Sequence, residues 1–501
     1  MALLLEGTYP YVAGGVSSWV DQVLGAHADR LFALLHIGPY PGAYQKPVYT
    51  LPGNVVGMTE IYCRGGYDEV VGKRRNVSTA AVKRRSSRPS KSRVLDALRR
   101  MHLSDVVDDE LLNDLAAGDL SVSELLHGSP SFQLCRELYD EIGNEAAFMD
   151  FFWHYRAMHV PLLRVLEAPC PRAGLLHAVS TGYAGVVGSV NSLRNGVPLV
   201  LTEHGLYARE RDLELGRASW IQDRRGPIGT TRASPLRRFW SHYFRMLSRL
   251  AYWRASRIVT LSEDNRAKQL SDGADANKCA IVPNGVKHPI VVAPTGVDEL
   301  PPRRLARGTS PPHRMRVGFV GRVVPIKDVV TLIRAVGLAR RQVDLECWII
   351  GPEDEDQVYA QRCHDVVKAL GLEDSIEFLG PQKVSEIYPQ LDALVLTSFS
   401  EGQPLVILEA FSHGLPVIAT DVGACRELLE GGGSDKQLGH SGIVTRVANP
   451  ADTAAAMVEL ARKPALRREM GSIGAARVAA RYQLEQVVKS YDSLYSCLVS
   501  P

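Results

Sequence analysis

The stretch Ser398-Phe-Ser-Glu-Gly-Gln-Pro-Leu-Val-Ile-Leu-Glu-Ala-Phe-Ser-His-Gly-Leu-Pro-Val-Ile-Ala-Thr decides the fold. An apolar strand ends near Ser398, a Glu-Gly turn follows, and a helix begins with Pro404 in its first turn, where proline is favoured. The free amides near Gly402–Leu405 then form the positive N-terminus of a helix beside the strand end. This arrangement predicts an anion site suited to a diphosphate.

Two carboxylates flank this helix start. Glu401 lies in the turn, and Glu409 lies about two turns into the helix at 3.6 residues per turn. A buried carboxylate needs hydrogen-bond donors, and the hydroxyls of a sugar are good ones. The alternative is structural, with Glu401 capping the helix and Glu409 on the surface. The apolar neighbours of Glu409 favour a partly buried, ligand-facing position for it.

A second stretch, Val317-Gly-Phe-Val-Gly-Arg-Val-Val-Pro-Ile-Lys-Asp, supplies two cations. Arg322 follows an apolar strand and Lys327 opens the next helix. Ligands of an open parallel sheet bind beyond the carboxyl ends of its strands. We therefore expect both cations on the same edge as Glu401, where they could neutralise a leaving diphosphate. The alternative is a pair of solvated surface charges.

The second half of the chain alternates short apolar strands with helices. The strands are predicted at 316–321, 345–351, 375–380, 392–398, 416–420 and 442–446, and the helices at 328–341, 356–370, 384–390, 403–413, 424–430 and 450–462. Apolar strands separated by helices indicate a parallel sheet that is covered on both faces. The fold class is therefore α/β, with a Rossmann-like doubly wound domain in this half.

The first half shows the same pattern less regularly. Strand-like stretches lie at 30–38, 173–179, 198–205 and 257–262, and helical patterns dominate 103–167. The predicted organisation is a Rossmann-like domain over 1–297 with a helical insertion at about 75–167, a Pro-rich linker at 298–313, a second Rossmann-like domain over 314–475 and a final helix over 476–501 that crosses back to the first domain. We expect the two domains to face a central cleft.

Composition excludes several other classes. The 501 residues are 45% hydrophobic and 23% charged, as in soluble globular proteins. No apolar run approaches a membrane span, and the start resembles no secretion signal. Eight scattered cysteines without a C-x-x-C motif indicate a reducing cytoplasm.

Residues 73–100 hold eleven bases and one acid. Such a run is typical of a solvated, mobile loop, or of a segment that binds a phosphate-rich partner such as anionic lipid. Nucleic acid is not expected, because no recognition motif accompanies the run.

The motifs G-R-x4-K (321–327) and S-E-G-x-P-x4-E-A-x3-G-x-P-V-I (400–418) resemble those of the retaining glycosyltransferases of family 4, which have the GT-B fold. The first stretch, LLLEGTYPYVAGGVSSWV (3–20), is similar to that of the cytosolic glycosyltransferases of the Pel exopolysaccharide pathway, the PelF family. The resemblance implies a UDP-sugar donor, a saccharide acceptor, no cofactor and no metal ion.

The resemblance also implies a role for each matching residue. Arg322 and Lys327 would hold the diphosphate, Glu409 the ribose and Glu401 the donor sugar. The remaining positions of the implied nucleotide-sugar site are Gly14, Gly15 and Val16 of the Gly-Gly turn, Phe378 and Leu379 beside the base, and Gly402, Gln403, Pro404 and Leu405 at the helix start. Glycine in the turn would allow a backbone contact that a side chain blocks.

Three further features carry alternatives. His204 matches the family's cleft histidine and is implied to be catalytic with Glu401, Arg322 and Lys327, although a histidine after a strand is often only a hydrogen-bonded loop residue. His177 is a weaker candidate of the same kind. Asn284-Gly285 is interpreted as a turn. The acids in Asp354-Glu-Asp356 are interpreted as a helix cap rather than a metal site.

These observations predict a retaining hexosyltransferase that moves a sugar from a UDP-sugar to a growing saccharide in exopolysaccharide biosynthesis. It would be cytoplasmic, or peripheral at the inner face of the membrane, where the run 73–100 could join a membrane-bound synthesis complex. Two alternatives remain open: a nucleotide-sugar epimerase of the same fold, and a non-catalytic component of a polysaccharide assembly.

Overall fold

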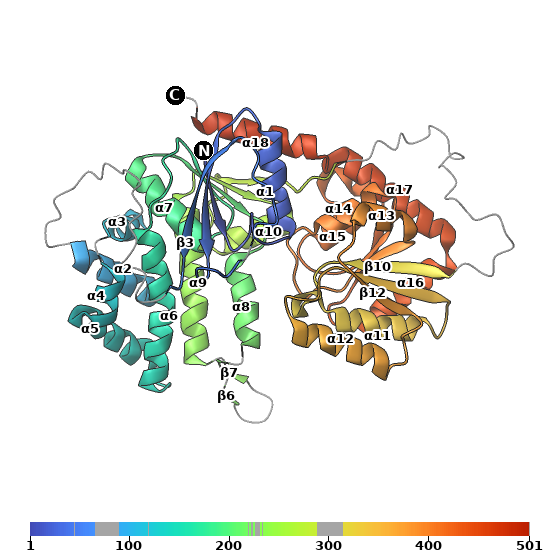
Figure 1. Cartoon of the computed structure of the whole chain (residues 1–501), viewed down its shortest axis with the longest axis horizontal. Helices are drawn as coiled ribbons and strands as arrows, with labels where there is room; N and C mark the ends of the chain where they lie inside the picture. Colours follow the sequence, from blue (N-terminus) through green and yellow to red (C-terminus); the bar gives the residue numbers. More distant parts are fainter. Residues whose placement is uncertain are drawn as a thin grey trace. The chain divides into compact units, whose positions relative to one another are not determined.

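A computed structural model of the chain describes residues 1–44, 46–65, 90–118, 120–218, 220–221, 224–225, 231–232, 234–287 and 314–499. The chain divides into two compact units: Met1–Thr260, Asn265–Ile281 and Tyr491–Pro501 form the first, and Leu261–Asp264 and Val282–Ser490 form the second. Figure 1 shows both units coloured along the sequence. The linker predicted at 298–313 lies outside the described residues.

The second unit is built on a six-stranded sheet in the order β12-β11-β10-β13-β14-β15, with every paired strand parallel. Its strands are β10 (Met315–Val320), β11 (Leu345–Ile350), β12 (Ile376–Gly380), β13 (Ala393–Leu396), β14 (Val417–Thr420) and β15 (Gly442–Thr445). Five of the six lie within the stretches predicted from sequence, and β10 begins one residue before its predicted stretch. The inner strands β13 and β14 are buried along their whole length, because helices cover both faces of the sheet.

The α-helices of this unit fall in the predicted places except α17, whose first residues, 464–475, were not predicted to be helical. They are α11 (Val329–Ala339), α12 (Gln357–Ala369), α13 (Val384–Ile387), α14 (Leu405–Ser412), α15 (Cys425–Glu430), α16 (Pro450–Arg462) and α17 (Pro464–Arg481), with 3-10 turns η2 (Pro325–Lys327), η3 (Tyr388–Gln390) and η4 (Gly433–Leu438). Helix α11 packs on α12 and α16, and α14 packs on α17. Asp356 is the N-cap of α12 and accepts the amide of Tyr359 at 2.9 Å, which confirms the predicted cap.

The first unit contains a seven-stranded sheet in the order β3-β2-β1-β4-β5-β8-β9, also with parallel pairs. Its strands are β1 (Ala2–Glu6), β2 (Phe32–Gly38), β3 (Val55–Tyr62), β4 (Leu176–Ala178), β5 (Leu199–Glu203), β8 (Arg257–Thr260) and β9 (Cys279–Ile281). Strands β1, β3 and β9 were not predicted. The sheet carries α1 (Gly15–Ala26), α7 (Tyr183–Asn195), α8 (Tyr207–Arg217), α9 (Pro235–Arg254) and α10 (Glu263–Ser271), and a small hairpin, β6 (Arg224–Arg225) and β7 (Thr231–Arg232), lies between α8 and α9.

Helices fill the described residues between β3 and β4. They are α2 (Ser90–Leu103), α3 (Asp109–Ala116), α4 (Val122–His127), α5 (Ser129–Leu138), the π-helical turn η1 (Tyr139–Gly143) and α6 (Phe148–Glu167). They share an apolar core with α7 and α9. Figure 1 shows α2 to α6 grouped on one side of the sheet of this unit. None of the helices in the described ranges is both long enough and apolar enough to span a bilayer.

The prediction of a solvated loop over 73–100 is wrong for its last residues. Helix α2 contains residues 90–100, and its apolar face, with Val94 and Leu98, is buried. The basic side chains on the other face form ion pairs: Arg93 with Asp114 at 2.7 Å, Arg99 with Glu137 at 2.8 Å and Arg100 with Asp108 at 2.5 Å. The helical period separates the two faces, and the count of bases alone did not reveal it. Residues 73–89 lie outside the described residues.

The single final helix predicted over 476–501 is also wrong. The chain forms α17 and a separate α18 (Leu484–Val499), and Tyr482 and Gln483 between them leave the helical path. The amide of Val286 donates to the carbonyl of Tyr482 at 2.9 Å, and the amide of Leu484 donates to the carbonyl of Val286 at 3.0 Å. This short parallel bridge interrupts the helix because it takes over backbone groups that a continuous helix would use.

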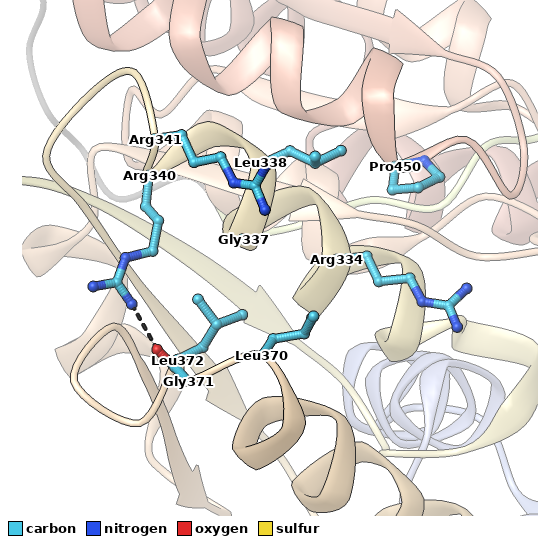
Figure 2. A pocket seen from close by; sticks show the side chains of 9 residues that line it. All are labelled: Arg334, Gly337, Leu338, Arg340, Arg341, Leu370, Gly371, Leu372 and Pro450. Atoms are coloured by element: carbon cyan, nitrogen blue, oxygen red, sulfur yellow. Dashed lines mark hydrogen bonds between the residues drawn. The ribbon is translucent and has the colours of Figure 1, made fainter.

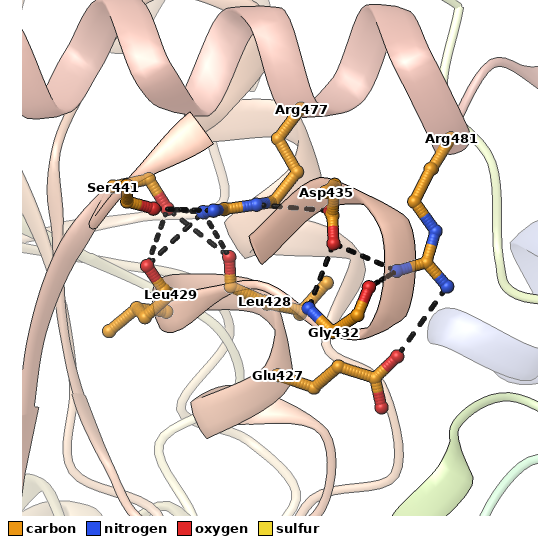
Figure 3. Close-up of polar contacts among 9 residues, drawn as sticks. Glu427, Leu428, Leu429, Gly432, Asp435, Ser441, Arg477 and Arg481 are labelled. Atoms are coloured by element: carbon orange, nitrogen blue, oxygen red, sulfur yellow. Dashed lines mark hydrogen bonds and ion pairs between the residues drawn. The ribbon is translucent and has the colours of Figure 1, made fainter. Parts of the chain in front are cut away.

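A buried arginine fixes the loop between α15 and β15. The guanidinium of Arg477, on α17, is fully buried and donates to backbone carbonyls and one hydroxyl, as Figure 3 shows. Its acceptors are Leu428 O at 2.9 Å, Leu429 O at 3.1 Å, Gly439 O at 2.6 Å and Ser441 Oγ at 2.6 Å. Asp435, also buried, pairs with Arg477 at 3.2 Å and with Arg481 at 3.0 Å. The loop therefore depends on charge pairing inside the unit.

Replacing Arg477 with leucine should lower the free energy of unfolding by about 3–5 kcal/mol, because Asp435 and several carbonyls lose a buried partner. Urea denaturation followed by circular dichroism measures this loss. The matched control is Arg446→Leu, which breaks an exposed pair with Asp452 and should cost no more than about 1 kcal/mol. Equal losses for the two variants would contradict a structural role for the buried network.

Candidate functional site

The loop after β10 is fastened to the end of β13 in the second unit. The hydroxyl of Thr397 donates to the carbonyl of Lys327 at 3.2 Å and to that of Asp328 at 3.0 Å. The amide of Phe399 donates to the carbonyl of Ile326 at 2.8 Å. Asp328 has left-handed backbone angles (φ 46°, ψ 50°) and caps α11 by accepting the amide of Thr331. These bonds bring the two predicted motifs together at the carboxyl edge of the sheet.

Lys327 and Glu401 form an ion pair at this edge. The ammonium Nζ lies 2.5 Å from Glu401 Oε1, which also accepts the hydroxyl of Ser398 at 2.5 Å. The Glu401 side chain is only 10% exposed, so these two donors replace most of its contact with water. The pair joins one residue from each predicted motif, 74 positions apart in sequence.

The turn that carries Glu401 requires a glycine from a neighbouring loop. Gly423 has φ +52°, and a Cβ atom there would lie 2.0 Å from the carbonyl oxygen of Glu401 and 2.5 Å from that of Gly402. The amide of Ala424 donates to the carbonyl of Gly402 at 2.8 Å. Any side chain at 423 would therefore move the Glu401–Gly402 turn.

Helix α14 begins two residues later than the predicted start at 403. Pro404 is the N-cap, with φ −71° and ψ 116°, and Leu405 is the first helical residue. Proline still suits this place, because its missing amide would have no partner in the helix. Gln403 is buried: its Oε1 accepts the amide of Asn284 at 2.6 Å, and its carbonyl accepts the Asn284 side-chain amide at 3.1 Å. The Gln403 side chain thus holds the segment 282–287 as well as flanking the helix start.

Glu409 lies on α14 and is partly buried. Its Oε2 accepts the hydroxyl of Tyr388 at 2.8 Å, and the Tyr388 ring lies 5.1 Å from the ring of His413. Burial raises the pKa of the Glu409 carboxyl above its ordinary value, and the Tyr388 hydrogen bond opposes that shift. A buried carboxyl with a shifted pKa is typical of a functional site, where it can accept hydrogen bonds from a ligand.

Arg322 does not contact the Lys327–Glu401 pair. Its guanidinium Nη1 donates to both carboxylate oxygens of Glu355, at 2.6 and 2.5 Å. The loops that carry the two residues pack closely, because a Cβ atom at Gly351 (φ +145°) would lie 2.0 Å from the carbonyl oxygen of Gly321. The acids at 354–356 were interpreted only as a cap, so Glu355 was missed as the partner of Arg322. An acid following the adjacent strand was the available signal.

Phe378 and Leu379 lie on β12 at the margin of the sheet. The Phe378 ring is 4.0 Å from the ring of His364, and the carbonyl of Leu379 accepts the side-chain amide of Gln382 at 2.8 Å. The pairing of β12 with β11 shifts register next to them, between Ile349 and Ile350. This irregularity ends regular pairing at the edge where a nucleotide base is predicted to bind.

In the first unit, the Gly-Gly turn leads into α1. Gly14 is the N-cap, no side chain caps the helix, and the first turn contains no acidic residue. A Cβ atom at Gly14 would meet nothing within 4 Å, so the protein itself does not require glycine there. The amides at Gly15 and Val16 are in the first turn, where a helix has no internal acceptors for them. The first turn of α1 is therefore available to an anion.

His204 follows β5 and is nearly buried. Its ring packs edge-on against Trp19 of α1 at 4.7 Å, and its Nε2 has no hydrogen-bond partner among the described residues. Burial lowers the pKa of His204 to about 4, so the imidazole is neutral at pH 7. His177, by contrast, is committed to the fold: Tyr495 OH lies 2.9 Å from its Nδ1 and Thr202 Oγ1 lies 2.8 Å from its Nε2.

Glu203, next to His204, was not singled out from the sequence. It is fully buried and accepts four hydrogen bonds, from Thr181 Oγ1 at 2.9 Å, Tyr207 N at 3.1 Å, Tyr252 OH at 2.6 Å and Gln269 Nε2 at 2.8 Å. This carboxylate ties α8, α9 and α10 to the end of β5. The rigid neighbour fixes the backbone that carries His204.

One pocket of the second unit lies away from these residues (Figure 2). Its lining comes from the second half of α11, the segment after α12 and the start of α16: Arg334, Gly337, Leu338, Arg340, Arg341, Leu370, Gly371, Leu372 and Pro450. Helix α11 leads back to the start of β11, so the pocket lies toward the amino ends of the strands. Arg340 there donates to the carbonyl of Gly371 at 3.0 Å. The pocket contains none of the predicted site residues.

Comparisons with known proteins match the two parts of the chain to two different families. Residues 1–277 match the family described as "Domain of unknown function (DUF3492)", and residues 314–463 match the family described as "Glycosyl transferases group 1". A D-inositol 3-phosphate glycosyltransferase of Geodermatophilus obscurus is 31% identical over 264 residues, which are 48% of this chain and 52% of that protein. The chain spans about half the length of the relatives it matches.

Solved GT-B glycosyltransferases share the fold over nearly the whole chain. Anabaena HepE in complex with UDP and glucose superposes with a TM-score of 0.57 at 15% identity, covering 99% of both chains. Sucrose-phosphate synthase from Thermosynechococcus elongatus superposes with a TM-score of 0.59 at 16% identity, covering 99% of this chain and 98% of that one. The two Rossmann-like domains predicted from sequence are therefore confirmed as a GT-B fold.

The raised pKa of Glu409 predicts that Glu409→Gln increases the stability of the folded chain, and that the increase depends on pH. Ionisation of this carboxyl is less favourable in the folded chain than in the unfolded chain, so its cost appears as pH rises above the ordinary value near 4.5. The ligand-free variant should be more stable than the natural chain at pH 8, and the difference should vanish toward pH 4. Thermal melts across this range measure it. Exposed Glu386→Gln is the control and should show no such trend; the same trend there would contradict the assignment.

Proposed function

We propose that this chain, which belongs to the family described as domain of unknown function DUF3492 and carries a glycosyl transferases group 1 domain over residues 314–463, transfers a sugar from a UDP-sugar to a growing saccharide with retention at the anomeric carbon. The observation that carries the proposal is the Lys327–Glu401 pair at the carboxyl edge of the second sheet. The solved structure of HepE with UDP and glucose, which shares the fold, supports a nucleotide-sugar donor.

In this proposal the second unit binds the donor. The diphosphate would lie against Lys327, the exposed Arg322 and the first amides of α14, where positive charge is available. Glu409 would accept the ribose hydroxyls, and Glu401 a hydroxyl of the sugar. The pair Arg322–Glu355 is exposed, so its exchange for a phosphate would cost little. The base would lie beside Phe378 and Leu379.

Catalysis would then be mainly electrostatic. Negative charge grows on the diphosphate as the glycosidic bond stretches, and fixed cations stabilise it more than they stabilise the bound substrate. The departing phosphate would take the proton of the acceptor hydroxyl, which then attacks the same face of the sugar. Lys327 and Arg322 supply the charge that a divalent metal supplies in other transferases, so we expect no metal requirement.

The first unit would contribute His204 and the turn at Gly14–Val16. A neutral imidazole has one N–H donor and one acceptor nitrogen, and the unpartnered Nε2 of His204 could contact a sugar hydroxyl in either role. The amides of Gly15 and Val16 would approach the donor phosphate or the acceptor.

The narrower assignment concerns the pathway. The stretch 3–20 resembles the PelF family, and on that basis we infer a role in exopolysaccharide biosynthesis. Recruitment to a membrane-bound synthesis complex is inferred for the basic run without Arg93, Arg99 and Arg100 of α2, because these three already have partners in the fold.

Replacing Lys327 with alanine should lower the rate of sugar transfer by about 10²–10³-fold, because the leaving diphosphate loses a fixed cation. Release of UDP from the donor, measured with a coupled assay, reports the rate. Lys383→Ala is the matched control, since that lysine forms only an exposed pair with Glu386. The melting temperature of the variant separates a loss of rate from misfolding. If the unpaired Glu401 carboxylate destabilises Lys327→Ala, the double variant Lys327→Met/Glu401→Gln removes both charges and is used in its place. A normal rate in the folded variant would refute the role.

Donor and reaction class can be tested together. Titration calorimetry across UDP, GDP, ADP and their sugars should show UDP-sugars bound at least about tenfold more tightly than the other nucleotides, or about 1.4 kcal/mol. An NMR time course should then show a new glycosidic signal, with the anomeric configuration of the donor, only when a saccharide is added. An altered UDP-sugar formed without any saccharide would instead identify an epimerase. No binding by any nucleotide would favour a non-catalytic component.

A further inference from the structure

Helices α5 and α6 of the first unit present large apolar side chains to solvent. Phe132 is 48% exposed, Met149 55% and Trp153 57%. Ring contacts connect Phe132 to Trp153 through two further rings: Phe132 lies 6.2 Å from Phe148, Phe148 lies 6.3 Å from Phe152, and Phe152 lies 5.7 Å from Trp153. Met149 follows Phe148 directly in sequence. We call these five residues the aromatic strip. A contiguous exposed apolar surface of this kind is typical of an interaction site.

Phe152 packs partly against the core of the insertion, whereas Phe132, Met149 and Trp153 are exposed and lie outside that core. On α6, the side chains of Phe151, Tyr155 and Met158 are buried and pack into the core of the insertion. The spacing of these three residues, four and then three positions, defines the inner face of α6. Met149 and Trp153, four positions apart, are exposed and so lie on another face. Two faces of one helix are therefore apolar, and only one of them is covered by the described residues.

The segment from η1 into the first turn of α6 gives the strip an acidic border on one side. Asp140, Glu141, Glu145 and Asp150 are all exposed, and residues 140–150 contain no basic residue. The π-helical turn η1, which carries the first two, contacts the strip through Tyr139, whose ring lies 5.1 Å from that of Phe148. This charge opposes binding to anionic lipid headgroups, whose surface potential is also negative. It favours a basic partner.

The strip already binds one cation of the chain itself. The guanidinium of Arg156 lies 4.9 Å from the centre of the Trp153 ring and 5.6 Å from that of Phe152. Aromatic faces attract Lys and Arg through their quadrupole, and exposed tryptophan and phenylalanine are typical anchors of protein interfaces. The strip therefore combines an apolar anchor, cation-binding rings and an acidic border.

We propose that the aromatic strip docks a basic amphipathic helix of a partner protein, with aliphatic side chains on the strip and Lys or Arg side chains beside the acids of residues 140–150. An amphipathic helix placed on an apolar surface uses anchors one turn apart, about 5.4 Å, and Met149 and Trp153 present that spacing. The proposal involves neither Lys327 nor Glu401 and stands independently of the proposed sugar transfer.

Two labelled peptides test the charge and the surface together. An 18-residue helix of leucine and lysine and its leucine–glutamate counterpart, with the same apolar face, are titrated against the full chain by fluorescence anisotropy. The lysine peptide should bind with a dissociation constant in the micromolar range, and the glutamate peptide should bind at least about tenfold more weakly. The double variant Phe132→Ser/Trp153→Ser should raise the dissociation constant of the lysine peptide at least about tenfold. The triple variant Asp140→Asn/Glu141→Gln/Asp150→Asn should have the same effect.

The control is Val358→Ser, which removes a side chain that is 84% exposed in the second unit and should leave binding unchanged. All substituted positions are exposed, and circular dichroism verifies that each variant is folded. Equal binding of the two peptides, or unchanged binding by the Phe132/Trp153 variant, would overturn the proposal. So would a dimer in sedimentation that this variant dissociates, which would identify a second copy as the occupant. Flotation with phosphatidylglycerol vesicles that is lost only in this variant would identify a membrane instead.

Discussion

The ion pair between Lys327 and Glu401 is the contact on which the proposed site depends. The Glu401 side chain is largely buried and accepts the Lys327 ammonium, and Lys327 is held by a loop that is bonded to the end of β13. Each side chain therefore requires the other, and both require the crossing of two loops at one sheet edge. The Gly423 contact adds a third loop to this arrangement, since only glycine lets the Glu401–Gly402 turn approach so closely. The charges are positioned before any ligand binds, as electrostatic catalysis demands.

The second unit could be predicted almost completely from sequence because its strands are short apolar runs punctuated by glycine and proline. The same approach missed β1, a buried strand at the start of the chain, and β3, whose exposed Val56 and Gly57 break the apolar pattern. It joined α17 to α18 because nothing in residues 476–498 signals the break. The bond partner is Val286, far away in sequence, and a local pattern cannot contain it.

In the site too, the position of each residue could be predicted from its local sequence, whereas its side-chain partners could not. Glycines, prolines and charges in order were enough to place Lys327 and Glu401 on one edge, because both follow strands of a parallel sheet. Pairing was not predictable. Arg322 contacts Glu355, and Gln403 contacts Asn284, since side chains choose among all acceptors that folding brings near. Glu203 and His204 are adjacent in sequence, yet the first has four hydrogen bonds and the second has a nitrogen that no described residue contacts by a hydrogen bond. Burial of a polar residue does not by itself reveal whether its partners come from the protein.

The Lys327–Glu401 pair also has a consequence for the proposed donor. If the ammonium turns toward a diphosphate, Glu401 keeps only the hydroxyl of Ser398 as a donor, and a nearly buried carboxylate that loses a partner is costly. A free nucleotide diphosphate offers nothing in return at that position. A nucleotide sugar offers hydroxyls that can donate to Glu401, so it restores what the exchange removes. The same pair that holds the cation in place would therefore favour the intact donor over the nucleotide product and would assist product release.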